Sequence, residues 1–104
     1  MMKIKTNQLT GAALDWAVTK IEAERKLFTI YPQYITPYST DWAQGGPIIE
    51  REKTAIKENG YGHWFAKVGA GKWMHGPTPL IAAMRCYVAS KLGDYIDIPE
   101  ELTP

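Results

Sequence analysis

The sequence has a single cysteine, almost no excess of charge and no long apolar run. With Cys86 alone, no disulfide can form within the chain, which agrees with a reducing compartment. The 12 lysines and arginines nearly balance the 11 aspartates and glutamates, whereas a basic excess is usual in nonspecific DNA-binding proteins. The longest apolar run, Leu80–Met84, is far shorter than the roughly 20 residues that cross a bilayer. We therefore expect a cytoplasmic protein that does not act at a membrane.

What the sequence does contain is enough apolar material for one folded domain. Four tryptophans, six tyrosines and two phenylalanines among the 104 residues supply large side chains to a single core. The chain has no internal repeat and no low-complexity tract. We therefore treat residues 1–104 as a single domain, with a tail from about residue 99.

Two segments have the apolar spacing of helices. The first is Gly11–Arg25, whose apolar residues recur at intervals of three and four, and its charged residues are expected to face water. These charged residues include Asp15, Lys20, Glu22 and Glu24. The second is Pro79–Leu92, preceded by Thr78 as N-cap and followed by Gly93. This helix is apolar on nearly every side, so we expect other elements to cover it on more than one side.

Short alternating segments predict strands. The candidates are Lys3–Lys5, Leu27–Tyr31, Tyr34–Tyr38 and Asp94–Ile98. A hairpin is expected where His63–Val68 and Lys72–His75 flank the turn Gly69–Gly71. If Val68 pairs with Lys72, large aromatic side chains lie on both faces of this hairpin. Helices then cover both faces, or one face binds a partner.

The segment between residues 39 and 58 has two interpretations. Either one helix spans Thr40–Lys57 and includes Gly45 and Gly46, or a turn and a break precede a helix that begins at Pro47. We favour the second, because two glycines and a proline together destabilise a helix interior by several kcal/mol.

Three blocks of residues resemble a known family. The blocks Leu14–Val18, Ser39–Arg51 and Pro77–Cys86 resemble the NinX-like family of bacteriophage proteins, in the same order along nearly the whole chain. The layout is also similar, by pattern and spacing, to a phage α/β/α sandwich domain. The resemblance implies a small accessory protein of temperate phages or prophages of enteric bacteria, acting in the host cytoplasm, and it implies no enzymatic activity.

The first candidate surface is the Tyr38–Gly46 segment. Its candidate residues for binding a ligand or partner are Tyr38, Ser39, Asp41, Trp42 and Gln44. Polar groups beside an aromatic side chain on a constrained loop are typical of such sites. The alternative is structural: Ser39 or Asp41 caps a helix, and Trp42 enters the core. Both interpretations stay open, and the structural one is the commoner for such residues.

Arg85 is the second candidate, because it lies in the middle of the apolar helix. A buried arginine is normally paired, so we predict an ion pair with Asp41, Glu50 or Glu52. The alternative is that its guanidinium binds a carboxylate or phosphate in a pocket beside Trp42.

Trp73 is the third candidate, because it can stack on single-stranded nucleic acid near a basic edge. The lysines of that edge are Lys3, Lys5, Lys67 and Lys72. Ordinary solvated charges are the commoner explanation of such lysines, and the acidic tail opposes binding, so we do not favour nucleic acid as the partner.

Other motifs carry little chemistry. His63 and His75 are too few for a zinc site, and the Gly69–Lys72 stretch lacks the spacing of a phosphate-binding loop. Ser39 and Ser90 lack the context of a catalytic nucleophile. We therefore predict no metal, no cofactor and no catalytic residue.

These observations predict an α+β domain in which helices pack on a small antiparallel sheet, as in an α/β/α sandwich. The predicted function is that of a noncatalytic phage accessory protein that binds a host or phage protein. A nucleic-acid-associated role is an alternative, as is a ligand binder or enzyme with a pocket around Tyr38–Trp42 and Arg85. The sequence leaves self-association open.

Overall fold

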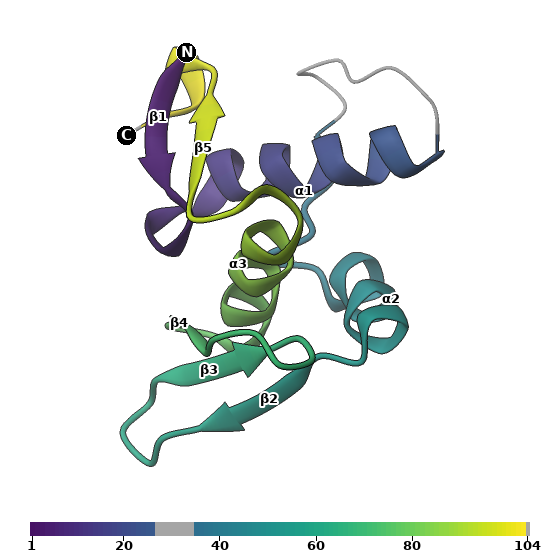
Figure 1. Ribbon diagram of the computed structural model, residues 1–104, viewed down its shortest axis with the longest axis vertical. Helices are drawn as coiled ribbons and strands as arrows, with labels where there is room; N and C mark the ends of the chain where they lie inside the picture. Colours follow the sequence, from purple (N-terminus) through teal and green to yellow (C-terminus); the bar gives the residue numbers. More distant parts are fainter. Residues whose placement is uncertain (27–34, 104) are drawn as a thin grey trace.

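The computed structural model describes residues 1–26 and 35–103, in which three α-helices accompany two antiparallel sheets (Figure 1). The helices are α1 (Gly11–Lys26), α2 (Trp42–Glu52) and α3 (Pro79–Leu92). The strands are β1 (Met2–Lys5), β2 (Ala55–Glu58), β3 (Trp64–Lys67), β4 (Met74–Gly76) and β5 (Tyr95–Ile98). The α+β prediction is confirmed, although the strands form two sheets where one was expected.

The centre of the molecule is α3, which lies between the two sheets (Figure 1). Residues 82–88 are all buried, because α1, α2 and the three-stranded sheet contact this helix from different sides. The prediction that other elements cover this helix on more than one side is therefore confirmed. Its ends also follow the prediction, since the Thr78 hydroxyl accepts the N–H of Ile81 at 3.0 Å and Gly93 follows the last turn.

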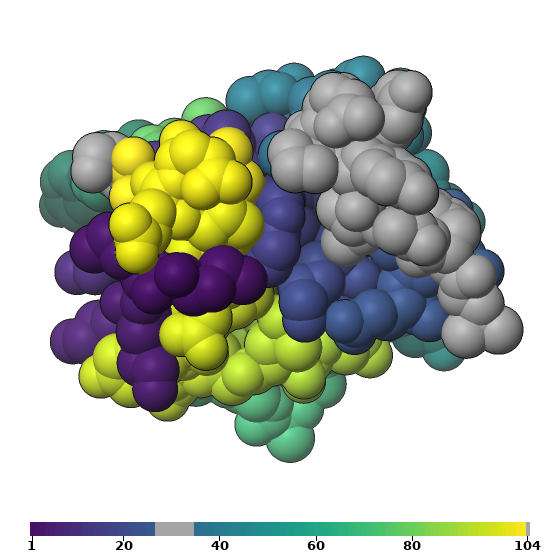
Figure 2. Space-filling model, turned by 90° about the horizontal axis from the view of Figure 1, so that it is seen from above, coloured from purple at the N-terminus to yellow at the C-terminus, as the bar shows by residue number. Residues whose placement is uncertain are grey.

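The smaller sheet joins the two ends of the chain. In it β1 pairs with β5, and Figure 2 shows the first strand, in purple, against the yellow C-terminal segment. Next to this pair, Thr6 holds the start of β5 through two bonds: its hydroxyl donates to the Gly93 carbonyl at 2.6 Å and its N–H to the Asp94 carbonyl at 2.8 Å. The strands predicted at Lys3–Lys5 and Asp94–Ile98 are therefore present.

The larger sheet has the order β2–β3–β4, and its hairpin has the predicted register. Ala66 lies opposite Met74, and both are buried against α3. Strand β2 is not among the predicted strands, because the sequence pattern places residues 54–58 in the middle segment. Its start is fixed by Lys53, which ends α2 in a left-handed conformation with φ 53°.

Helix α2 begins earlier than predicted, because it starts at Trp42 and includes Gly45, Gly46 and Pro47. The prediction of a break before Pro47 is wrong. A β-carbon on Gly45 would lie 2.5 Å from the Tyr38 carbonyl oxygen and 2.6 Å from Leu80 Cδ1. The glycine thus lets α2 approach its neighbours closely, and this packing outweighs its low helix propensity.

Two further predicted strands are not found as expected. Residues 35–38 form no strand, because the chain turns at residues 38–40, so the prediction for Tyr34–Tyr38 is wrong over these residues. The strand predicted at Leu27–Tyr31 lies outside the described residues. In the described ranges, no helix has the length and apolar character needed to span a bilayer.

Candidate partner-binding surface

The Tyr38–Gln44 block mainly fixes α2 against α1. The Ser39 N–H donates to Asp15 Oδ1 at 2.8 Å in a buried contact, and the Asp41 carboxylate caps α2 by accepting the Ala43 N–H at 2.9 Å. Of the five candidate residues of this block, Trp42, which is 53% exposed, and Gln44 are the exposed ones. Partner binding by this block stays a prediction.

Arg85 is buried, but it does not pair with an acid. Its guanidinium donates to the Leu9 carbonyl at 2.7 Å and to the His75 carbonyl at 3.0 Å. Among the described residues, it forms no ion pair with Asp41, Glu50 or Glu52, so that prediction is wrong. Two backbone carbonyl dipoles satisfy this cation, while burial lowers its pKa.

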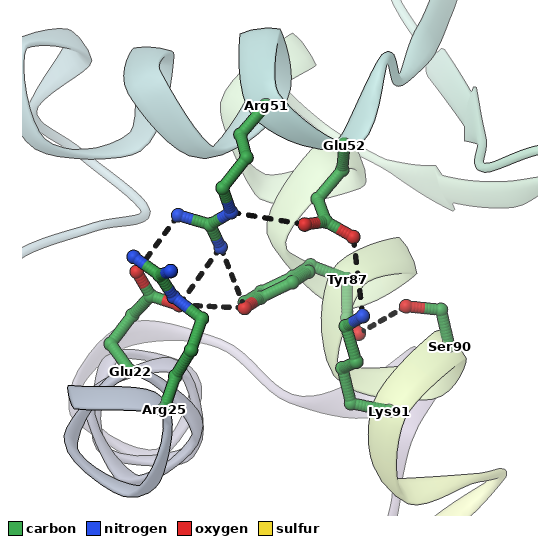
Figure 3. Close-up of polar contacts among 7 residues, drawn as sticks. All are labelled: Glu22, Arg25, Arg51, Glu52, Tyr87, Ser90 and Lys91. Atoms are coloured by element: carbon green, nitrogen blue, oxygen red, sulfur yellow. Dashed lines mark hydrogen bonds and ion pairs between the residues drawn. The ribbon is translucent and has the colours of Figure 1, made fainter. Parts of the chain in front are cut away.

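Among the described residues, a partly buried ion pair joins other side chains (Figure 3). The Glu22 carboxylate on α1 accepts hydrogen bonds from both terminal nitrogens of Arg51 on α2, at 3.2 and 3.0 Å. It also accepts one from the Tyr87 hydroxyl on α3, at 2.6 Å. Arg51 also donates to the Tyr87 hydroxyl at 2.8 Å. The three helices therefore meet at one carboxylate, whose side chain is only 4% exposed.

This cluster extends outward through Glu52, which accepts from Arg51 Nε at 3.0 Å and pairs with Lys91 at 3.3 Å. Burial acts to raise the pKa of Glu22, but the bonds from Tyr87 and Arg51 outweigh it and leave this pKa lowered. Burial and the neighbouring Glu22 raise the pKa of Tyr87.

Helical spacing does not predict this cluster, because it places Asp15 and Glu22 on the water side of the first helix. Both are buried, so that expectation is wrong. Glu22 could be identified only by its pairing with a cation on another helix, Arg51 on α2. The spacing of residues within the first helix does not contain this information.

The outward face of the larger sheet differs from these packed regions. We call it the lysine–tryptophan face, and its members are Lys57, Phe65, Lys67, Trp73 and His75. The Trp73 ring is 38% exposed and lies 4.2 Å from Lys57 Nζ and 5.1 Å from Lys67 Nζ, measured to its centroid. Beside it, the Phe65 and His75 rings are 6.4 Å apart. Ammonium groups this close to an indole hold it in place by cation–π attraction.

Two hollows lie along this face. One, of about 370 Å³, is lined by Lys57, Glu58, Asn59, Phe65 and Trp73. The other, of about 250 Å³, continues past Trp73 and His75 to the smaller sheet, where Lys5 and Tyr95 line it. This second hollow also includes Lys72, whose ammonium group pairs with Asp94 at 2.7 Å.

The structure therefore brings together residues that were predicted separately. Lys5, Lys72 and Trp73 of the predicted basic edge line one hollow, although Lys5 comes from the other sheet. The Tyr38–Gln44 block and Arg85 are not joined by any hydrogen bond or ion pair within residues 1–26 and 35–103. A shared pocket for them is thus not supported by their contacts.

Comparison with known proteins identifies the family of the chain. The model of the family described as "Bacteriophage P22, NinX" matches residues 5–91, which run from the end of β1 almost to the end of α3. No curated protein matches the chain significantly. The family match confirms the resemblance that the three sequence blocks indicated.

Proposed function

The chain belongs to the NinX family of bacteriophage proteins, and from this we propose that it is a noncatalytic accessory protein that acts by binding a partner in the host cytoplasm. The sequence favours a host or phage protein as that partner. The binding surface is the lysine–tryptophan face, extended by the hollow that reaches Lys5.

The observation that carries this proposal is the environment of Trp73. A tryptophan that is 38% exposed leaves much of a large apolar ring in water, and two lysines hold it in a defined orientation. Tryptophan is among the residues most enriched at binding hot spots, and charged neighbours steer a partner of opposite charge. This combination favours binding of a partner with negative charge.

The rival proposal of an enzyme or ligand pocket receives less support. It needs free charged groups at Asp41 and Arg85, but the Asp41 carboxylate caps α2 and the Arg85 guanidinium is held by two carbonyl groups. Groups engaged in this way are not free to bind or activate a substrate.

Site-specific photocrosslinking in phage-infected cells tests the proposal. A benzophenone amino acid replaces His75, which is exposed on the lysine–tryptophan face, or Gln44, which is exposed on α2 as the matched control. We expect adducts from position 75 that disappear when Trp73→Ala is added, and no such adducts from position 44.

Adducts from position 44 alone would contradict the proposal and point to the Tyr38–Gln44 block. Absence of adducts at both positions would also contradict it. An adduct between two copies of the chain at position 75 would identify the partner as a second copy.

A further inference from the structure

We propose that the lysine–tryptophan face binds single-stranded nucleic acid. This inference rests on the proposed function for its binding surface, but it assigns nucleic acid to that surface in place of the protein partner that the sequence favours. Platforms for single strands combine exposed aromatic rings, on which bases stack, with cations that follow the phosphate backbone. Both components occur here along one continuous surface.

The aromatic component is a row of three side chains from both sheets. Phe65 and Trp73 line the first hollow, while Trp73 and Tyr95 line the second. Tyr95 is 53% exposed, so both ends of the second hollow offer ring surface to solvent. The rings of Trp73 and Tyr95 are therefore both accessible to bases at this hollow.

The cationic component lies between these rings. Lys57 and Lys67 flank Trp73, and Lys5 lies with Tyr95 in the second hollow. None of the ion pairs in the described ranges involves these three lysines. Lys57 and Lys67 lie over the Trp73 ring, so they reach phosphate groups by leaving the ring face on which a base stacks.

The acids of this surface are already engaged. Asp94 is neutralised by Lys72, and the Glu58 carboxylate accepts the backbone N–H groups of Gly60 and Gly62. The net charge of the chain is only +1, so the excess of positive charge is local to this face. A local excess explains why overall composition did not indicate nucleic acid.

The chemistry favours a single strand over a duplex. Stacking on Trp73 requires a free base face, which paired bases inside a duplex do not offer. The two hollows, of about 370 and 250 Å³, are also small pockets rather than a groove that receives a double helix. An acidic protein segment would pair with the lysines, but fewer of its side chains could stack on Phe65, Trp73 and Tyr95.

The test is fluorescence anisotropy with a fluorescein-labelled 12-nucleotide oligo(dT), at sodium chloride concentrations from 20 to 200 mM. Each lysine that contacts a phosphate contributes about −0.7 to the slope of log affinity against log salt, so three lysines predict a slope of about −2. The matching duplex is expected to bind more weakly at every salt concentration.

Variants assign the binding to this face. Trp73→Ala is expected to weaken oligo(dT) binding about tenfold or more, because it removes one stacking platform. Lys57→Gln and Lys67→Gln are each expected to reduce the salt slope by about 0.7. Trp42→Ala, at an exposed tryptophan on α2, is the matched control and is expected to leave affinity unchanged. Urea unfolding of each variant establishes that it is folded under the conditions of the assay.

No binding of oligo(dT) at 20 mM salt would overturn the inference. Binding that Trp73→Ala does not weaken, with heparin bound equally well, would also overturn it, because this would be attraction of any polyanion. If position 75 crosslinks only to protein in infected cells and oligo(dT) does not bind, nucleic acid is refuted while the proposed function stands. Binding of oligo(dT) that weakens with salt and with Trp73→Ala supports the inference.

Discussion

Replacing Glu22 by glutamine tests how the three helices are held together. The Glu22 carboxylate accepts two bonds from Arg51 and one from Tyr87, and its side chain is 4% exposed. Glutamine has nearly the same shape but only one acceptor oxygen. In the variant, a donor of Arg51 or Tyr87 therefore faces an amide NH₂ group.

The expected cost follows from the burial of each partner. Removing one partner of a fully buried ion pair costs about 3–5 kcal/mol, and a hydrogen bond to a charged group contributes about 1.5–3 kcal/mol. The Arg51 side chain is 31% exposed and can regain water, so the lower part of these ranges applies. We expect Glu22→Gln to lower the free energy of unfolding by about 2–3 kcal/mol, with a fall in Tm of roughly 10 °C or more.

Urea unfolding at neutral pH measures this change. The matched control is Glu24→Gln on the same helix, because Glu24 is 62% exposed and pairs with Lys20 on the surface, where loss of the pair costs about 0.5 kcal/mol or less. A double-mutant cycle with Tyr87→Phe is expected to give a coupling energy of about 1 kcal/mol or more. Equal losses for Glu22→Gln and Glu24→Gln, or a coupling energy near zero, would refute the reasoning.

Three further predictions concern stability. The pKa of Glu22 is lower in the folded state than in the unfolded state, so its carboxylate stabilises the fold above the unfolded-state pKa and loses this effect as pH falls through the folded-state pKa. The difference in unfolding free energy between wild type and Glu22→Gln should therefore shrink as pH falls below about 4.5. Gly45→Ala should destabilise the protein by about 1–2 kcal/mol, because the added β-carbon would lie 2.5 Å from the backbone oxygen of Tyr38. Gly46→Ala should stabilise it by about 0.5–1 kcal/mol, since the nearest atom to its added β-carbon is 4.0 Å away. Urea unfolding measures both changes, and the opposite order would contradict the packing of α2. Arg85→Met should cost about 2–4 kcal/mol by leaving two carbonyl oxygens without donors, and a loss under 1 kcal/mol by thermal unfolding would contradict this role.

Features that were predicted correctly depend on short-range signals. The ends of α3 follow from Thr78 and Gly93, which act within one turn of the helix. The register of the hairpin follows from the turn predicted at Gly69–Gly71, because the position of a turn limits how its strands pair, although the paired strands end at Lys67 and resume at Met74. Such signals lie within a few residues of the structure that they determine.

Features that were missed depend on partners far along the chain. The start of α2 depends on Tyr38 and Leu80, because these residues pack so closely on Gly45 that only glycine fits there, despite its low helix propensity. The partners of Arg85 are carbonyl groups, which every residue has, so no residue type in the sequence could identify them. Glu22 and Arg51 are brought together only when α1 and α2 both pack on α3.

The lysine–tryptophan face also combines a residue that the sequence could identify with residues that depend on distant partners. Trp73 could be chosen from the sequence, because the hairpin pattern put it on a face with other aromatic side chains. The role of Lys57 could not, because β2 was not predicted and this lysine reaches Trp73 from that strand. Lys5 joins the surface only through the packing of the two sheets around α3.

The central claim is that the partner binds at Trp73, and ¹⁹F NMR of protein labelled with 5-fluorotryptophan tests it most directly. The four tryptophans report on different places: Trp16 in the core, Trp42 on α2, Trp64 on the inner face of the sheet and Trp73 on its outer face. Titration with oligo(dT) is expected to shift or broaden the Trp73 resonance, identified by its absence in Trp73→Phe, while the Trp42 resonance stays fixed. A shift at Trp42 with none at Trp73 would contradict the account.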